Sequence, residues 1–108
     1  MADASVPQNL GGQYGGLHTG GNVETAVFTS GGGRLCRVTI VTAGTAANSI
    51  YDGTNSTAGV LIWTDITNRT VGNQVDLQLP VTTGIVVKGT TGAAGVYVSY
   101  NKTGVYGT

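Results

Sequence analysis

The sequence predicts an all-β protein, an antiparallel β-sandwich of about seven or eight short strands. Runs rich in Val, Ile, Thr and Tyr alternate with Gly-, Asn- and Asp-rich turns. The turns recur at roughly the 8–12-residue spacing typical of a sandwich or barrel. The chain of 108 residues contains 19 glycines, one glutamate and two lysines, and no window repeats apolar residues at helical spacing. We therefore expect one small domain without helices as its main structure.

Three strands are expected in the first half of the domain. The first, 23–29, ends at a glycine-rich turn. In the second, 35–42, alternation places Cys36, Val38 and Ile40 on one face and two polar side chains on the other. The third, 48–52, follows a Gly/Ala/Thr turn and is expected to point Ile50 inward.

Four further strands are expected at 60–66, 74–79, 84–88 and 95–101, with 105–106 as an optional eighth. The strand 74–79 has the cleanest alternation of apolar and polar residues, and Pro80 should end it or place it at a sheet edge. Because short turns join successive strands, we expect neighbours in sequence to pair antiparallel, the last two strands around the 89–94 turn.

The first 22 residues are expected to form a flexible Gly-rich N-terminal arm, followed by a sandwich domain at 23–108. Six of the eleven residues at 11–21 are glycine, the residue that loses most entropy on ordering. Between the glycines stand Leu10, Tyr14, Leu17 and His18, which would act as partner-binding anchors when the arm orders. A disordered terminus with no partner is the alternative.

Five basic and five acidic residues cancel. A neutral chain argues against a nucleic-acid binder and against a polybasic membrane-surface protein, so neither partner is expected. The single cysteine allows no intrachain disulfide, which favours folding in a reducing cytoplasm. The first seven residues lack the basic and apolar regions of a signal peptide.

No catalytic set is apparent, and we expect no enzyme, no cofactor, no metal and no small-molecule substrate. His18 is the only histidine and Cys36 the only cysteine, too few for a transition-metal site within one chain. A catalytic base needs a fixed position, which a glycine-rich segment does not provide. The Cys36 thiol is expected to be buried and inert. Asp52, Asp65 and Asp76 lie in three segments, and nothing in the sequence brings two together.

Three aromatic residues are candidates for an interface. Trp63, Tyr51 and Tyr97 lie in separate strands. Trp63 is expected in the core or at a subunit interface. Several aromatics on one exposed face would instead stack on sugar rings, as in a glycan-binding module. Tyr97 and Tyr100 have opposite strand parity and point to opposite faces.

The domain is small, glycine-rich and without a disulfide, so an isolated monomer should be only modestly stable. Self-association or docking on a larger assembly would stabilise it. This is the strongest indication of a structural role that the composition provides.

The strand and turn segments at about 34–101 resemble small virion proteins of tailed bacteriophages, especially capsid decoration (cement) proteins. The segments that carry the resemblance are RVTIVTAGTAA (37–47), IYDGT (50–54), AGVLI (58–62), LQLP (77–80), TGIVV (83–87) and VYVSY (96–100). The resemblance implies a β-sandwich, made in the host cytoplasm, that assembles as a homotrimer on the capsid surface of the virion. It would bridge neighbouring copies of the major capsid protein. Similar modules in phage tails and fibres bind receptors or glycans, which is the alternative function.

Overall fold

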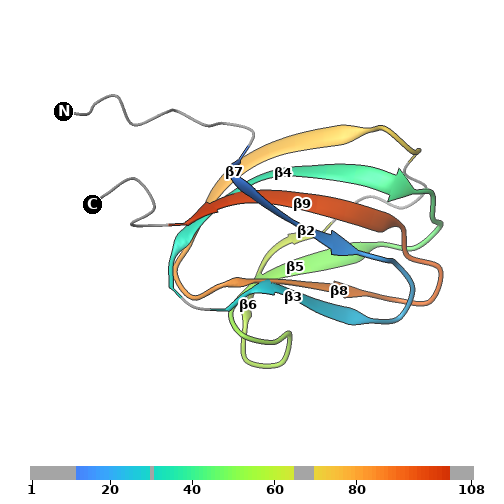
Figure 1. The fold of residues 1–108 in the computed structure, drawn as a ribbon. Helices are drawn as coiled ribbons and strands as arrows, with labels where there is room; N and C mark the ends of the chain where they lie inside the picture. Colours follow the sequence, from blue (N-terminus) through green and yellow to red (C-terminus); the bar gives the residue numbers. More distant parts are fainter. Residues whose placement is uncertain (1–11, 30, 65–69, 103–108) are drawn as a thin grey trace.

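The computed structural model describes residues 12–29, 31–64 and 70–102. Within them the chain forms two four-stranded antiparallel sheets packed face to face, with strand orders β2-β9-β4-β7 and β3-β8-β5-β6 (Figure 1). The strands are β2 (Tyr14–His18), β3 (Glu24–Phe28), β4 (Gly33–Thr42), β5 (Asn48–Asp52), β6 (Val60–Thr64), β7 (Gln74–Val81), β8 (Ile85–Gly89) and β9 (Gly95–Lys102). The predicted all-β sandwich is confirmed. The described part of the chain has no helix that is long and apolar enough to cross a membrane.

The core lies between the two sheets and is built mainly by the central strands. Each strand turns alternate side chains inward, and these are mostly β-branched. Burial of one such side chain stabilises the fold by about 1.5–3 kcal/mol. The aliphatic residues that the four central strands contribute to this core are Leu35, Val38, Ile40, Ile50, Ile85, Val87, Val96 and Val98.

The strand positions predicted from the sequence are confirmed for seven strands, but their pairing is not. Of the consecutive strands from β2 to β9, only β5 and β6 pair with each other. The segments 84–88 and 95–101, expected to form a hairpin, belong to different sheets. Most connections cross from one sheet to the other, because each strand has one apolar face and both sheets bury theirs against the same core. Pro80 lies in β7, an edge strand, as expected.

The prediction of a flexible arm over 1–22 is wrong for residues 14–18, which form strand β2. Tyr14 pairs with Tyr100 and His18 with Val96. The glycines permit close packing there: a Cβ on Gly16 would lie 2.9 Å from Val27 Cγ1. Glycines that indicated flexibility instead bring β2 against its neighbours. Residues 1–11, including Leu10, and the proposed strand at 105–106 lie outside the described residues.

The prediction that Cys36 shares a face of its strand with Val38 and Ile40 is wrong, because β4 contains a bulge. The pairing of β4 with β9 shifts by one residue between Leu35 and Arg37. Leu35 and Val38 therefore both face the core, and Cys36 joins Arg37 on the outer side of the sheet. Strict alternation across this segment had grouped Cys36 with the core residues.

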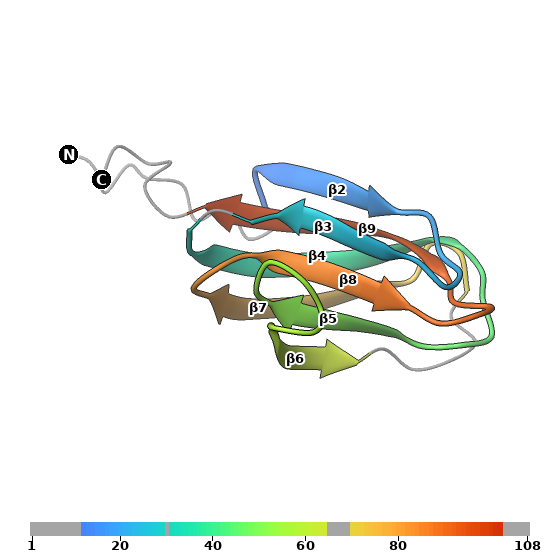
Figure 2. The ribbon, with the colours of Figure 1, turned by 90° about the horizontal axis from the view of Figure 1, so that it is seen from below.

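The loop between β5 and β6 folds over the outer side of the β3-β8-β5-β6 sheet (Figure 2). Ser56 Oγ donates a hydrogen bond to the Glu24 carboxylate on β3, and Gly59 packs against Tyr51 on β5. Val86, which pairs with Tyr51 and Ala26 on that outer side, is fully buried. This loop therefore covers much of one outer sheet surface.

Candidate functional site: the outer side of the β2-β9-β4-β7 sheet

Two residues predicted to bind partners meet on the outer side of the β2-β9-β4-β7 sheet. Leu17 on β2 pairs directly with Tyr97 on β9, and their exposed fractions are 51% and 43%. The row continues through Thr39 on β4 to Gln74 on β7. We call this row, together with the neighbouring row, the open face; the neighbouring row consists of Gly15, Ser99, Arg37 and Asp76.

The Tyr97 ring occupies the space left by the missing side chain of Gly15. A Cβ on Gly15 would lie only 2.0 Å from the Tyr97 hydroxyl oxygen. The ring thus lies over the β2 backbone beside Leu17, and the two form an exposed apolar pair. Such a pair loses water-accessible apolar area when a partner covers it, which contributes about 1 kcal/mol per half-buried side chain.

Charges on the open face compensate each other. Arg37 Nε lies 2.6 Å from Asp76 Oδ1, with side-chain exposures of 32% and 61%. A solvent-exposed ion pair contributes at most about 1 kcal/mol to stability. Its effect here is that the pair adds no net charge to the surface. The two rows of the open face therefore offer shape and apolar area more than net charge.

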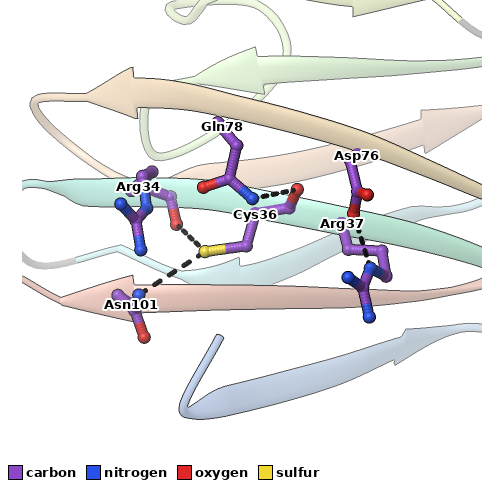
Figure 3. Close-up of polar contacts among 6 residues, drawn as sticks. All are labelled: Arg34, Cys36, Arg37, Asp76, Gln78 and Asn101. Atoms are coloured by element: carbon purple, nitrogen blue, oxygen red, sulfur yellow. Dashed lines mark hydrogen bonds and ion pairs between the residues drawn. The ribbon is translucent and has the colours of Figure 1, made fainter. Parts of the chain in front are cut away.

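Polar contacts join three strands around the β4 bulge, next to the open face (Figure 3). The Cys36 thiol donates to the Arg34 carbonyl oxygen at 3.6 Å and accepts from Asn101 Nδ2 at 3.5 Å. Gln78 Nε2, on β7, donates to the Cys36 carbonyl oxygen at 3.4 Å. Cys36 is fully buried, so the predicted burial of its thiol is confirmed. These contacts link the bulge to both neighbouring strands, β7 and β9.

Tyr14, predicted as an arm anchor, stacks within the sandwich. Its ring centroid lies 5.6 Å from that of Tyr100, which in turn lies 4.7 Å from Phe28. The Lys102 ammonium lies 5.3 Å from the Tyr14 centroid. This aromatic stack ties β2 to β9 and to β3 in the other sheet, and leaves 40% of Tyr14 exposed.

The structure does not bring the three interface aromatics together. Tyr97 lies on the open face. Tyr51 is half-buried on the other sheet, beneath the β5–β6 loop. Trp63 on β6 packs against the core, which is one of the two locations that the sequence predicted for it. The multi-aromatic platform expected of a glycan-binding module is therefore not formed by these residues.

His18, the remaining predicted anchor, points into the sandwich and is fully buried. Its Nδ1 lies 2.9 Å from Thr25 Oγ1 on β3. It therefore holds β2 in place and does not present itself to a partner. Sequence analysis missed Thr39, Gln74 and Ser99 as parts of the open face, since only the pairing register across β2, β9, β4 and β7 shows that they share it.

The side chain of Asp52 on β5 binds the turn between β7 and β8. Its carboxylate accepts hydrogen bonds from Thr82 N at 2.8 Å, Thr82 Oγ1 at 3.1 Å, Thr83 N at 2.8 Å and Gly84 N at 3.3 Å. Burial by itself raises the pKa of Asp52, but these hydrogen bonds outweigh it and lower the pKa below its ordinary 3.8. Asp65 lies outside the described residues. Within the described ranges, no three His, Cys, Asp or Glu side chains gather as around a metal ion.

Comparison with protein-family models, with curated proteins and with solved structures found no match to this chain. Its function therefore has to be inferred from its residues and their geometry. Two features distinguish the open face: the exposed Leu17–Tyr97 pair and the Arg37–Asp76 ion pair in the neighbouring row.

Proposed function

We propose that the protein is a structural virion protein that binds the outside of a phage head and cements contacts between major capsid proteins. The open face supplies the binding surface in this proposal. Its Leu17–Tyr97 pair is the observation that carries it, because the pair exposes two adjacent apolar side chains beside a compensated Arg37–Asp76 ion pair. The resemblance of residues 34–101 to capsid decoration proteins supports the same conclusion.

In the proposed mechanism, the protein bridges neighbouring capsid subunits through a binding surface that is rigid before it binds. The sheet backbone holds Leu17 and Tyr97 in fixed positions, so little conformational entropy is lost when a capsid surface covers them. Attachment of a neutral chain should depend little on salt. A homotrimer would present three copies of the open face and so bind several capsid subunits at once.

The alternative function is a receptor- or glycan-binding module of a phage tail or fibre. One observation favours it: the Tyr97 ring lies exposed beside polar residues, including Ser99 and Thr39. An aromatic face bordered by hydroxyl groups suits stacking on a sugar ring. Against this, Tyr97 has no second aromatic residue from the predicted set beside it.

The test is binding to phage heads assembled without the protein, measured by co-sedimentation at low and high salt. The doubly substituted Leu17→Ser, Tyr97→Ser protein is expected to lose at least tenfold in affinity. Its melting temperature should fall somewhat, because Tyr97 packs over Gly15, so binding is measured well below that temperature. The matched control is Val60→Ser, Leu61→Ser on β6, which removes apolar side chains that are even more exposed (67% and 53%) from another surface.

Unchanged binding of the open-face variant, or equal loss in the β6 control, would show that this face does not bind capsids. The glycan-binding alternative would be established by a different result: saturable binding to cell-surface polysaccharide that Tyr97→Ser abolishes, together with no binding to phage heads. A many-fold loss of head binding at high salt would contradict a neutral, apolar contact.

A further inference from the structure

A buried histidine fastens β2 across the two sheets. Among the described strands β2 lies at the edge of its sheet, next to β9 alone, and two of its five residues are glycine. His18 lies at its end, fully buried, with Nδ1 2.9 Å from Thr25 Oγ1 on β3 of the opposite sheet. A strand with so few side chains depends strongly on each contact it makes, and this one is its polar link to the second sheet.

The other side of the imidazole ring faces Asn48 on β5. Asn48 Nδ2 donates to the Ala94 carbonyl oxygen at 2.9 Å, which orients the amide so that Oδ1 points the other way. Oδ1 of Asn48 and Nε2 of His18 both border Gly89 on β8, where a Cβ would lie 2.9 Å from the first and 3.0 Å from the second. Neither atom has a well-aligned hydrogen bond within the described part of the chain. The ring is thus enclosed by β3, β5, β8 and β9.

These neighbours suit a neutral imidazole. The Thr25 hydroxyl, 2.9 Å from Nδ1, can donate to an unprotonated ring nitrogen, while Asn48 Oδ1 lies on the Nε2 side of the ring. A protonated ring could keep both partners, because a hydroxyl group can turn and accept. What these neighbours lack is a negative charge to balance a buried cation.

The charged groups near the ring oppose its protonation or turn away from it. On β8, the Lys88 ammonium acts on the ring electrostatically, and its Nζ donates to Asn22 Oδ1 at 2.9 Å and to the Gly89 carbonyl oxygen at 3.0 Å. On β3, the Glu24 carboxylate accepts from Ser56 on the far side of that sheet. The side chains of β5 and β9 nearest the ring, Asn48 and the register partner Val96, carry no charge.

We propose that His18 is an acid-sensitive latch: when its imidazole takes up a proton, β2 detaches from the sandwich and the open face loses Leu17. The proposal goes beyond the binding function and holds whichever partner that face binds. It concerns a local opening at one edge, because the central strands keep their own core contacts.

The direction of the pH dependence follows from the pKa of His18. Burial lowers this pKa below 6.5, the nearby Asn48 amide raises it, Lys88 lowers it further, and the sum is a lowered value. A released, hydrated His18 regains its ordinary pKa, so the open form binds the proton more readily. Above the ordinary pKa both forms are neutral and β2 is held fully. As the pH falls toward the folded-state pKa, the open population increases by up to about tenfold per pH unit.

The test combines hydrogen exchange with titration of the single histidine. Exchange of backbone amides in peptides covering β2 is measured by mass spectrometry between pH 7.5 and 4.5 and corrected for intrinsic rates. We expect opening of β2 to increase as the pH falls, while peptides from β8 stay protected. His18 is the only histidine, so its imidazole proton signals in NMR spectra need no further assignment and should titrate below 6.5 together with the opening.

The control variant is His18→Gln, whose amide offers a donor and an acceptor but takes up no proton in this range. Its β2 opening should not change with pH. Equal pH dependence in this variant, or an imidazole that titrates at 6.5 or above while β2 stays protected, would overturn the latch. If the variant does not fold, the wild-type comparison decides: opening and imidazole titration at different pH values would also overturn it.

Discussion

Single side chains form hydrogen bonds with backbone groups that the strand pairing leaves unsatisfied. Asp52, at the end of β5, satisfies three successive backbone amides of the β7–β8 turn, those of Thr82, Thr83 and Gly84. These hydrogen bonds attach the turn that follows β7 to β5, which lies in the other sheet. A carboxylate binds such amides more strongly than a neutral acceptor does, because the hydrogen bonds are charge-assisted.

Asp52→Asn is expected to lower the free energy of unfolding by about 1 kcal/mol at neutral pH, since the site is partly open to water. The pKa of Asp52 is lowered below 3.8 in the folded state, so its stabilisation is complete above that value. It is lost as the pH falls through the folded-state pKa. Urea unfolding at pH 7 and at pH 2–3 should show that the difference between wild type and variant disappears in acid.

The matched control for that experiment is Asp76→Asn, which breaks the exposed pair with Arg37. Its expected effect is about 0.5 kcal/mol, within the limit of about 1 kcal/mol for an exposed ion pair. An equal loss in both variants would mean that the hydrogen bonds of Asp52 add nothing beyond a surface charge.

At the scale of elements, the pair β4 and β9 forms the centre of one sheet and admits very little extra volume. Gly33, at the start of β4, pairs with Lys102, and a Cβ there would lie 2.1 Å from the Asn101 carbonyl oxygen. Backbone cannot move aside as a side chain can. The glycine is therefore required by packing and not by a turn conformation.

Gly33→Ala is expected to destabilise the protein by roughly 2 kcal/mol or more, through displacement of β9 from β4. Gly31→Ala is the matched control, because a Cβ there meets nothing within 4 Å, although φ is +91°. The left-handed backbone alone should cost about 1 kcal/mol. Thermal unfolding of both variants checks the order; a larger loss for Gly31→Ala would show that β4 and β9 separate easily.

At the scale of the whole molecule, the sandwich covers its two outer sheet surfaces unequally. The β5–β6 loop lies over one of them, and Ser56 holds it to β3. On the other, Leu17 and Tyr97 stay exposed beside a compensated ion pair. A neutral chain of 10.9 kDa with this asymmetry is suited to self-association or to attachment to a larger assembly.

Light scattering should give a solution mass three times the 10.9 kDa of one chain, as expected for a homotrimer. A trimer that persists in the open-face variant Leu17→Ser, Tyr97→Ser would place the subunit contacts elsewhere and leave this face available for a capsid. A mass of one chain across the concentration range would contradict the trimer.

By itself the sequence determined where seven of the strands lie. Alternation of apolar and polar residues is a local property with a period of two, and Gly, Asn and Asp mark turns through their own backbone preferences. For this reason 48–52 matches β5, and Val38, Ile40 and Ile50 were recognisable as core residues.

Only the tertiary structure decided which strands pair, where β2 lies and which side Cys36 faces. Gln13 and Asn101, whose hydrogen bond joins the start of β2 to β9, are 88 positions apart. No local pattern encodes such a contact, and a one-residue bulge reverses the face of every residue that precedes it. Glycines that reduce order in an isolated segment become necessary once a neighbour fills their space, as Tyr97 does at Gly15.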